Sequence, residues 1–134
     1  MATYVQVNKF AVKDIFDAKY KTRAIAVMQK SVDKAIKGKL TTDAPKDKNT
    51  KGYSLDGSLV SLAPDKAGKK LEGKVMMQIS TWPGKSMKAM PSGTAATTIA
   101  GPDKIDAGDV DAIVAAAVES AMKTATSYME SHAP

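Results

Sequence analysis

Residues 110–129, VDAIVAAAVESAMKTATSYM, decide the fold of this chain. Apolar side chains recur there every three or four residues, which is the spacing of one face of an α-helix. Asp106 or Asp109 precedes this stripe and can cap the helix, because a carboxylate accepts the free N–H groups of the first turn. The stretch therefore predicts a long amphipathic helix that needs a second layer to cover its apolar side. The stripe consists of Val110, Ile113, Val114, Ala117, Val118, Ala121, Met122, Ala125 and Met129.

The second layer is predicted by strands earlier in the chain. Residues 53–62 form one expected strand, and Asp56-Gly57 within it favours a bulge, because a hairpin turn there would leave a very short arm. Residues 70–80 alternate most regularly between apolar and polar side chains, which indicates a strand with one buried side. That side consists of Leu71, Val75, Met77 and Ile79.

The first third of the chain contains a strand, a helix and a loop. Residues 4–12 are rich in β-formers and predict a first strand. A helix is expected from about residue 21 to residue 37, because apolar residues again follow the helical spacing, and Gly38 is positioned as its C-cap. Residues 39–51 have neither periodicity nor appreciable apolar content, so we expect a mobile loop there.

A fourth strand is expected from Met87 to about Ala100. Pro91 and Gly93 interrupt it, and proline is tolerated mainly at the edge of a sheet, so this strand belongs at an edge. The order of elements is then β-α-β-β-β-α. We expect an α+β fold in a single domain, residues 1–134, in which two helices pack on one face of a mainly antiparallel sheet of about four strands.

Composition excludes several classes of protein. The chain has 134 residues, of which 43% are hydrophobic and 25% charged, as in a typical globular domain. No apolar run approaches the ~20 residues of a membrane-spanning helix, so no transmembrane segment is expected. Because the chain has no cysteine, disulfides, zinc–thiolate sites and thiol catalysis are excluded. No cofactor is expected.

The net charge of +6 is unevenly distributed. Residues 1–51 carry 11 lysines and Arg23 against five aspartates, whereas residues 105–134 carry one lysine against five acids. A positive field attracts anionic polymers. However, 19 of the 20 basic residues are lysines, while bidentate recognition of phosphate or guanine favours arginine. Aromatic residues for base stacking are also few. Nucleic acid is therefore disfavoured as a partner, and a solvated lysine surface is favoured.

Three motifs suggest chemistry but lack the context that the chemistry needs. Residues 84–86 (Gly-Lys-Ser) resemble the end of a P-loop, but Ile79 replaces the first glycine and the segment joins two expected strands. The Ser-x-x-Lys matches at Ser31 and Ser120 lack the other motifs of acyl-transferring serine enzymes. The aspartates of residues 103–111 lack EF-hand spacing and suit helix capping. No catalytic or metal-ligating set is therefore expected.

The turn that begins at Trp82 is the candidate interaction surface. An aromatic ring beside flexible thioethers at a sheet edge can form an adaptable apolar contact. The alternative is that Trp82 closes the end of the core. The candidate surface consists of Trp82, Lys85, Met87, Met90 and Met76, the last of which points to the face opposite its neighbours.

Three segments resemble small exported proteins of proteobacteria that have no known function. The segments are residues 52–59 (GYSLDGSL), residues 71–87 with their Thr-Trp-Pro turn, and Ser92-Gly93. The resemblance covers roughly residues 52–130 and implies a shared fold and a periplasmic or secreted location, with no activity attached. It also implies an export signal that this chain does not contain. A cytoplasmic location is the alternative.

Three classes of function follow. We expect first a monomeric, non-catalytic envelope or secreted module that binds a protein or an anionic polymer. The second class is an electrostatic binder of nucleic acid or anionic lipid, whose affinity would fall steeply with added salt. The third is a small hydrolase-like enzyme without a recognisable motif. It would need a walled pocket that unites residues such as Asp56, Ser92 and Thr94 and perturbs their pKa values.

Overall fold

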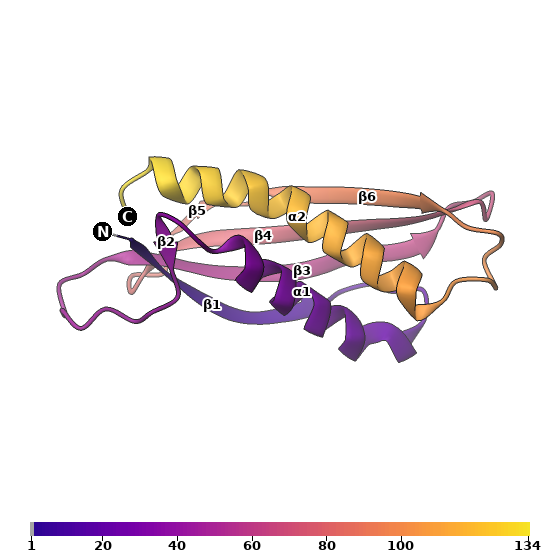
Figure 1. The fold of residues 1–134 in the computed structure, drawn as a ribbon, viewed down its shortest axis with the longest axis horizontal. Helices are drawn as coiled ribbons and strands as arrows, with labels where there is room; N and C mark the ends of the chain where they lie inside the picture. The colour runs from indigo at the N-terminus through magenta and orange to yellow at the C-terminus, as the bar shows by residue number, and fades with distance from the viewer. Residues whose placement is uncertain (1) are drawn as a thin grey trace.

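The computed structural model describes residues 2–134, and its two long helices lie on the same face of one mixed β-sheet (Figure 1). The strands run in the order β2-β1-β3-β4 across the sheet, and β5 and β6 both pair with β4. The strands are β1 (Thr3–Val12), β2 (Leu40–Thr41), β3 (Gly52–Pro64), β4 (Lys70–Trp82), β5 (Met87–Ala89) and β6 (Ser92–Thr98). The helices are the 3-10 turn η1 (Ala18–Tyr20), α1 (Lys21–Ala35) and α2 (Ala107–Ser131).

Two of the five strand pairings are parallel, so the sheet is mixed, and it has six strands instead of the predicted four or so. β1 runs parallel to β2 and to β3, whereas β4 is antiparallel to β3, β5 and β6. The reason is the connection after β1. α1 carries the chain back along one face of the sheet, so that β3 enters in the same direction as β1.

The sheet has six strands. The sequence pattern predicted about four, because it did not reveal two short strands, β2 and β5. The expected fourth strand does lie at an edge of the sheet, but it divides into β5 and β6 at Met90 and Pro91. β2 comes from the expected loop of residues 39–51, where buried Leu40 pairs with Thr3 of β1. The mobility of residues 42–51 stays a prediction.

Local details differ from the sequence patterns by a few residues. β3 is continuous through Asp56-Gly57, as predicted, but its bulge lies between Leu59 and Ser61. α1 ends at Ala35 rather than near residue 37, and Gly38, with a φ of +68°, serves the turn into β2 instead of capping the helix.

The core lies between the sheet and both helices, and its composition confirms the buried residues predicted for α2 and β4. All nine apolar residues predicted for the helix are buried, and so are the four predicted for residues 70–80. Asp106 is the N-cap of α2: its carboxylate accepts the N–H of Asp109 at 2.8 Å, and the Asp109 carboxylate accepts the N–H of Asp106 at 3.1 Å. This capping box fixes the start of the helix.

One polar contact joins the two helices, and another joins the end of α2 to the sheet. Arg23 of α1 donates from Nε and Nη2 to the two carboxylate oxygens of Asp111 on α2, each at 2.7 Å. At the other end, the Tyr53 hydroxyl of β3 donates to the His132 carbonyl at 2.6 Å, and the His132 ring stacks on Tyr128 with centroids 4.2 Å apart. Burial raises the pKa of Tyr53 above its ordinary value. Asp106 and Asp109 form the capping box and Asp111 binds Arg23, so these three aspartates have structural roles.

Candidate interaction surface

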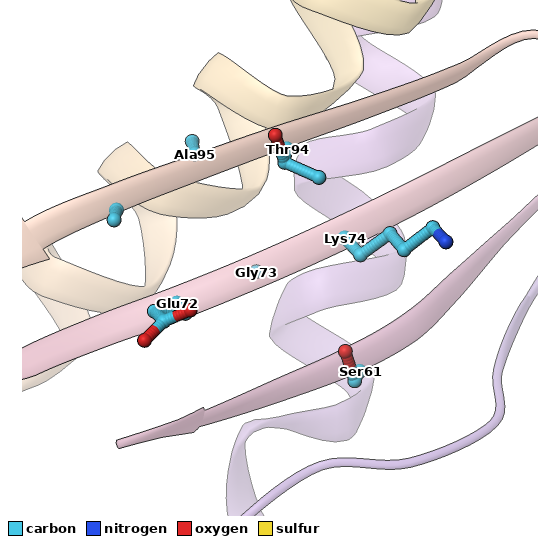
Figure 2. A pocket seen from close by; sticks show the side chains of 7 residues that line it. Ser61, Glu72, Gly73, Lys74, Thr94 and Ala95 are labelled. Atoms are coloured by element: carbon cyan, nitrogen blue, oxygen red, sulfur yellow. The ribbon is translucent and has the colours of Figure 1, made fainter. Parts of the chain in front are cut away.

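One face of the sheet carries no helix and is called here the open face. Side chains alternate along each strand, so those that do not enter the core point away from α1 and α2. Figure 2 shows this face with the helices behind it: Glu72 and Lys74 project from β4, Ser61 from β3 and Thr94 from β6. These residues border a shallow hollow of about 490 Å³. Gly73, Ala95 and Ala96 also line it.

Two of the predicted surface residues meet on the open face. Met76 of β4 and Met90, which follows β5, line a smaller hollow of about 150 Å³. Lys13, Asp56 and Gln78 are among the polar residues that surround it. Met90 is 49% exposed, so this hollow combines an accessible thioether with both signs of charge.

Trp82 lies at the end of β4 and packs against Tyr4 of β1. The two ring centroids are 4.7 Å apart with an interplanar angle of 76°, which is an edge-to-face contact. Gly52 of β3 pairs with Trp82 and lies beside Tyr4, so no side chain separates the two rings. Trp82 is half-buried, and its other neighbours line a hollow of about 340 Å³ that includes Lys51 and Pro83.

The turn between β4 and β5 presents Lys85 to solvent. Its backbone N–H donates to the Thr81 carbonyl at 2.7 Å, and the next N–H, of Ser86, donates to the Thr81 hydroxyl at 2.9 Å. Lys85 has a φ of 59°, in the left-handed region. Residues 84–86 thus form part of a hairpin turn between the antiparallel strands β4 and β5. The sequence analysis predicted that this segment joins two strands and is not a P-loop. Met87 follows and is 52% exposed.

Lysines gather at the same end of the molecule. The segment 42–51, the turn after β4, β5 and both chain termini lie together there (Figure 1). Residues 37–51 carry five lysines against two aspartates, and residues 82–88 carry two lysines and no acid, so together they hold +5 of the net +6. All seven lysines are exposed. Residues 37–51 and 82–88 are called here the lysine-rich end.

The structure divides the predicted surface into two parts. Met76 and Met90 share the hollow on the open face, whereas Trp82 borders a different hollow, and Lys85 and Met87 line neither. Tyr4 and Lys51 complete the second part. Tyr4 was not singled out because its partnership with Trp82 depends on β1 lying beside β3, and Lys51 looked like one of many lysines in a loop.

The residues considered for an enzyme do not converge. Asp56 borders the hollow of Met76 and Met90, Thr94 borders the hollow of Figure 2, and Ser92 lines neither. Within residues 2–134, no group of three or more His, Asp or Glu side chains is arranged to hold a metal ion. Over the same residues, no helix has the length and hydropathy needed to cross a membrane.

The shifted pKa values have structural causes away from these hollows. A hydrogen bond and the nearby charge of Asp111 raise the pKa of Arg23. The backbone N–H of Lys69 lowers the pKa of Asp65, whose carboxylate accepts that N–H at 2.9 Å in the turn between β3 and β4. Both groups hold elements together.

Comparison with known proteins supports the fold and supplies no ligand. No family model and no curated protein matches the sequence. A protein of the family DUF330 from Xanthomonas campestris has a TM-score of 0.61 at 14% identity, over 96% of this chain and 83% of that chain. Such low identity shows similarity of fold alone.

Two other solved structures are similar at a lower level. The PelC dodecamer from Paraburkholderia phytofirmans has a TM-score of 0.49 at 10% identity, over 88% of this chain and 84% of that chain. A minor lipoprotein from Acinetobacter baumannii has a TM-score of 0.46 at 13% identity, over 91% of each chain. Scores this low carry no argument, and none of these structures supports the expected monomer. What the comparisons establish is an α+β fold shared with a protein from Xanthomonas campestris.

Proposed function

We propose that the protein is a non-catalytic binding module of the bacterial envelope or of secreted material, and that it binds an anionic polymer at the lysine-rich end. The location rests on the resemblance of residues 52–130 to exported proteobacterial proteins. The alternative ligand for the same surface is a protein with an acidic surface.

The exposure of Met87 and Met90, 52% and 49%, is the observation that carries this proposal. Met87 and Met90 are the exposed large apolar side chains among the described residues, and folding alone does not require their exposure. The surrounding lysines attract an anion from a distance. Met87 and Trp82 belong to the lysine-rich end and offer an apolar contact that adapts to the shape of the partner, and Met90 extends the apolar surface beyond it.

A titration with polyglutamate tests the proposal directly. Trp82 is the only tryptophan, so its fluorescence reports this surface alone, and amide-resolved NMR locates the contact. We expect saturable shifts confined to the lysine-rich end that persist at physiological salt. Diffuse shifts on every lysine face that vanish with salt would contradict the proposal and leave only a solvated basic surface.

Lysines in the two hairpin turns provide a matched control. Lys85→Gln removes a charge at the lysine-rich end, and Lys66→Gln removes the same charge from the turn between β3 and β4. We expect only Lys85→Gln to weaken binding of polyglutamate. Equal effects of the two variants would mean that net charge, and not this surface, attracts the polymer.

An electrostatic binder of nucleic acid or anionic lipid is the second candidate. The concentration of +5 at one end favours it, because a compact basic patch binds any dense array of phosphates. Binding to single-stranded DNA or to anionic vesicles at low salt that disappears at physiological salt would favour this candidate over the first. A hydrolase is not proposed, because Asp56, Ser92 and Thr94 do not share a hollow.

A further inference from the structure

β6 (Ser92–Thr98) forms an unprotected edge of the sheet. It pairs with β4 along its whole length, and β4 is its single strand partner among the described residues. Natural edge strands are usually blunted by charged side chains, proline or bulges, which prevent pairing with another chain. β6 has none of these: it has the sequence SGTAATT and keeps a regular register with β4.

The hydrogen-bonding direction of each residue of β6 follows from its pairing with β4. The Ile99 N–H donates to the Lys69 carbonyl at 2.8 Å, and the Met77 N–H donates to the Pro91 carbonyl at 2.8 Å. Odd-numbered residues of this strand therefore turn their backbone groups toward β4, since backbone groups alternate in direction along a strand. The even-numbered ones turn their N–H and C=O groups outward: Ser92, Thr94, Ala96 and Thr98.

Charge is absent from this edge in a chain that is otherwise strongly basic. A quarter of all residues are charged, yet residues 89–102 contain no charged residue. Two copies with a net charge of +6 can therefore approach here without bringing lysines together. Lys88 precedes the uncharged stretch and Asp103 follows it. In an antiparallel arrangement of two copies, Lys88 of one copy and Asp103 of the other lie at the same end of the paired strands.

The layer of helices also permits a second copy at this edge. α2 packs on both β4 and β6, and Gly93 of β6 lies directly beneath Ala117 and Ser120. Strands lie about 4.8 Å apart, so pairing two β6 strands would set the two α2 helices roughly 10 Å apart, near the usual packing distance. The exposed residues on that side of α2 are small and uncharged: Ala116, Ser120, Thr124 and Ser127.

We propose that β6 is the edge through which two copies of this chain join, antiparallel, into one continuous sheet. The two-fold axis passes at Ala95, which sets Thr94 opposite Ala96 of the second copy and Ser92 opposite Thr98 of the second copy. Each outward N–H then finds an outward C=O, and the uncharged flanks of the two α2 helices meet above. Apart from Lys88, the joint leaves the lysine-rich end free, and the dimer replaces the monomer that the sequence led us to expect.

Sedimentation of the full chain over a range of concentrations is the test, with two alanines as a matched pair. Ala96 of β6 and Ala63 of β3 are both exposed and both pair with Glu72, from opposite sides. Ala96→Lys places a charge on the edge, whereas Ala63→Lys places the same charge inside the sheet beside the same glutamate. We expect a concentration-dependent dimer whose dissociation constant rises at least tenfold with Ala96→Lys and is unchanged by Ala63→Lys.

Backbone measurements separate strand pairing from other modes of association. Ala96→Pro removes an outward N–H and leaves the bonds to β4 intact, so it should also weaken the dimer at least tenfold while circular dichroism shows a folded protein. Amide exchange at Thr94, Ala96 and Thr98 should slow as the concentration rises, whereas exchange at Ala95 and Thr97 should not change. A monomer at NMR concentrations, a dimer indifferent to both Ala96 variants, or outward amides that exchange freely in the dimer would each overturn the proposal.

Discussion

Gly52 lets two aromatic rings from strands that are not neighbours meet on the open face. A side chain at this position would collide with the Tyr4 carbonyl oxygen and crowd its Cβ, at 3.1 Å. Tyr4 and Trp82 instead contact each other across the glycine, with ring centroids 4.7 Å apart. The contact holds Trp82 in place while part of its surface stays in solvent. We therefore expect that removal of the Trp82 side chain leaves the core closed.

Trp82→Ala is expected to remain folded and to lose about 1–2 kcal/mol of the free energy of unfolding, for a half-buried aromatic pair. Chemical denaturation measures this loss. The same variant should bind polyglutamate more weakly, as measured by NMR titration. Should the variant fail to fold, Trp82 would belong to the core, and the contact surface proposed for it would be wrong.

Gly93→Ala is expected to destabilise the protein by about 1–3 kcal/mol, as overpacking does elsewhere. The new methyl group would collide with the Ala117 carbonyl oxygen and the Ala121 nitrogen of α2, which are backbone atoms and cannot turn aside. Gly84→Ala is the control, because its methyl group would meet only the Thr81 hydroxyl, at 3.3 Å. Thermal denaturation measures the stability of both variants. Equal losses of stability would mean that β6 and α2 can move apart at little cost in free energy, which would contradict this prediction.

At the scale of single elements, α2 depends on its first turn. Asp106→Ala removes the carboxylate that accepts the Asp109 N–H and is expected to cost about 1 kcal/mol of stability. Asp103→Ala removes the same charge three residues earlier and should cost much less. The midpoint of urea denaturation is the measurement. If the two variants lose the same stability, the effect is one of charge rather than capping.

Asp65, in the hairpin turn between β3 and β4, should make the free energy of unfolding depend on pH in the acid range. Backbone N–H groups of Lys69 and Lys70 donate to Asp65 Oδ1 at 2.9 and 3.2 Å, and the Lys69 N–H lowers the carboxyl pKa below its ordinary value of 3.8. Because the folded pKa is the lower one, the carboxylate stabilises the folded protein above pH 3.8 and loses this effect as the pH falls through the folded pKa.

Asp65→Asn should therefore flatten the acid side of the stability profile. The amide oxygen can still accept an N–H, but it has no charge to lose as the pH falls. Urea denaturation of both proteins across the acid range gives the comparison. An unchanged acid profile in the variant would show that other carboxylates control it.

At the scale of the whole molecule, the elements were predicted more accurately than their arrangement. α2 and β4 have the buried residues that their spacing indicates, and the fourth strand lies at an edge as Pro91 suggests. The parallel pairing of β1 with β3 was missed, because it depends on where α1 lies and not on any local pattern. β2 was missed because two residues are too short to show a period.

The role of the candidate surface stays a prediction, and the sequence did not indicate how its residues are arranged. Met87 and Met90 are exposed, as an interaction surface needs. Met90 shares a hollow with Met76, whereas Trp82 borders another hollow nearer the end of β4, and the spacing of residues along the turn could not reveal this separation. Tyr4 joins Trp82 only because β1 and β4 flank Gly52 of β3. Its contribution was therefore hidden in the sequence.

The sequence alone determined which residues are buried in α2 and β4, that an aspartate (Asp106 or Asp109) caps the last helix, and that the protein carries lysines instead of a recognisable catalytic set. Each of these depends on neighbours within a few residues, where helical and strand periods act directly. Only the tertiary structure decided the parallel pairings of β1, the gathering of lysines at one end and the free outward backbone of β6. These features depend on which distant segments become neighbours, and that choice is made by the crossover of α1 and the shared core, not by any local spacing.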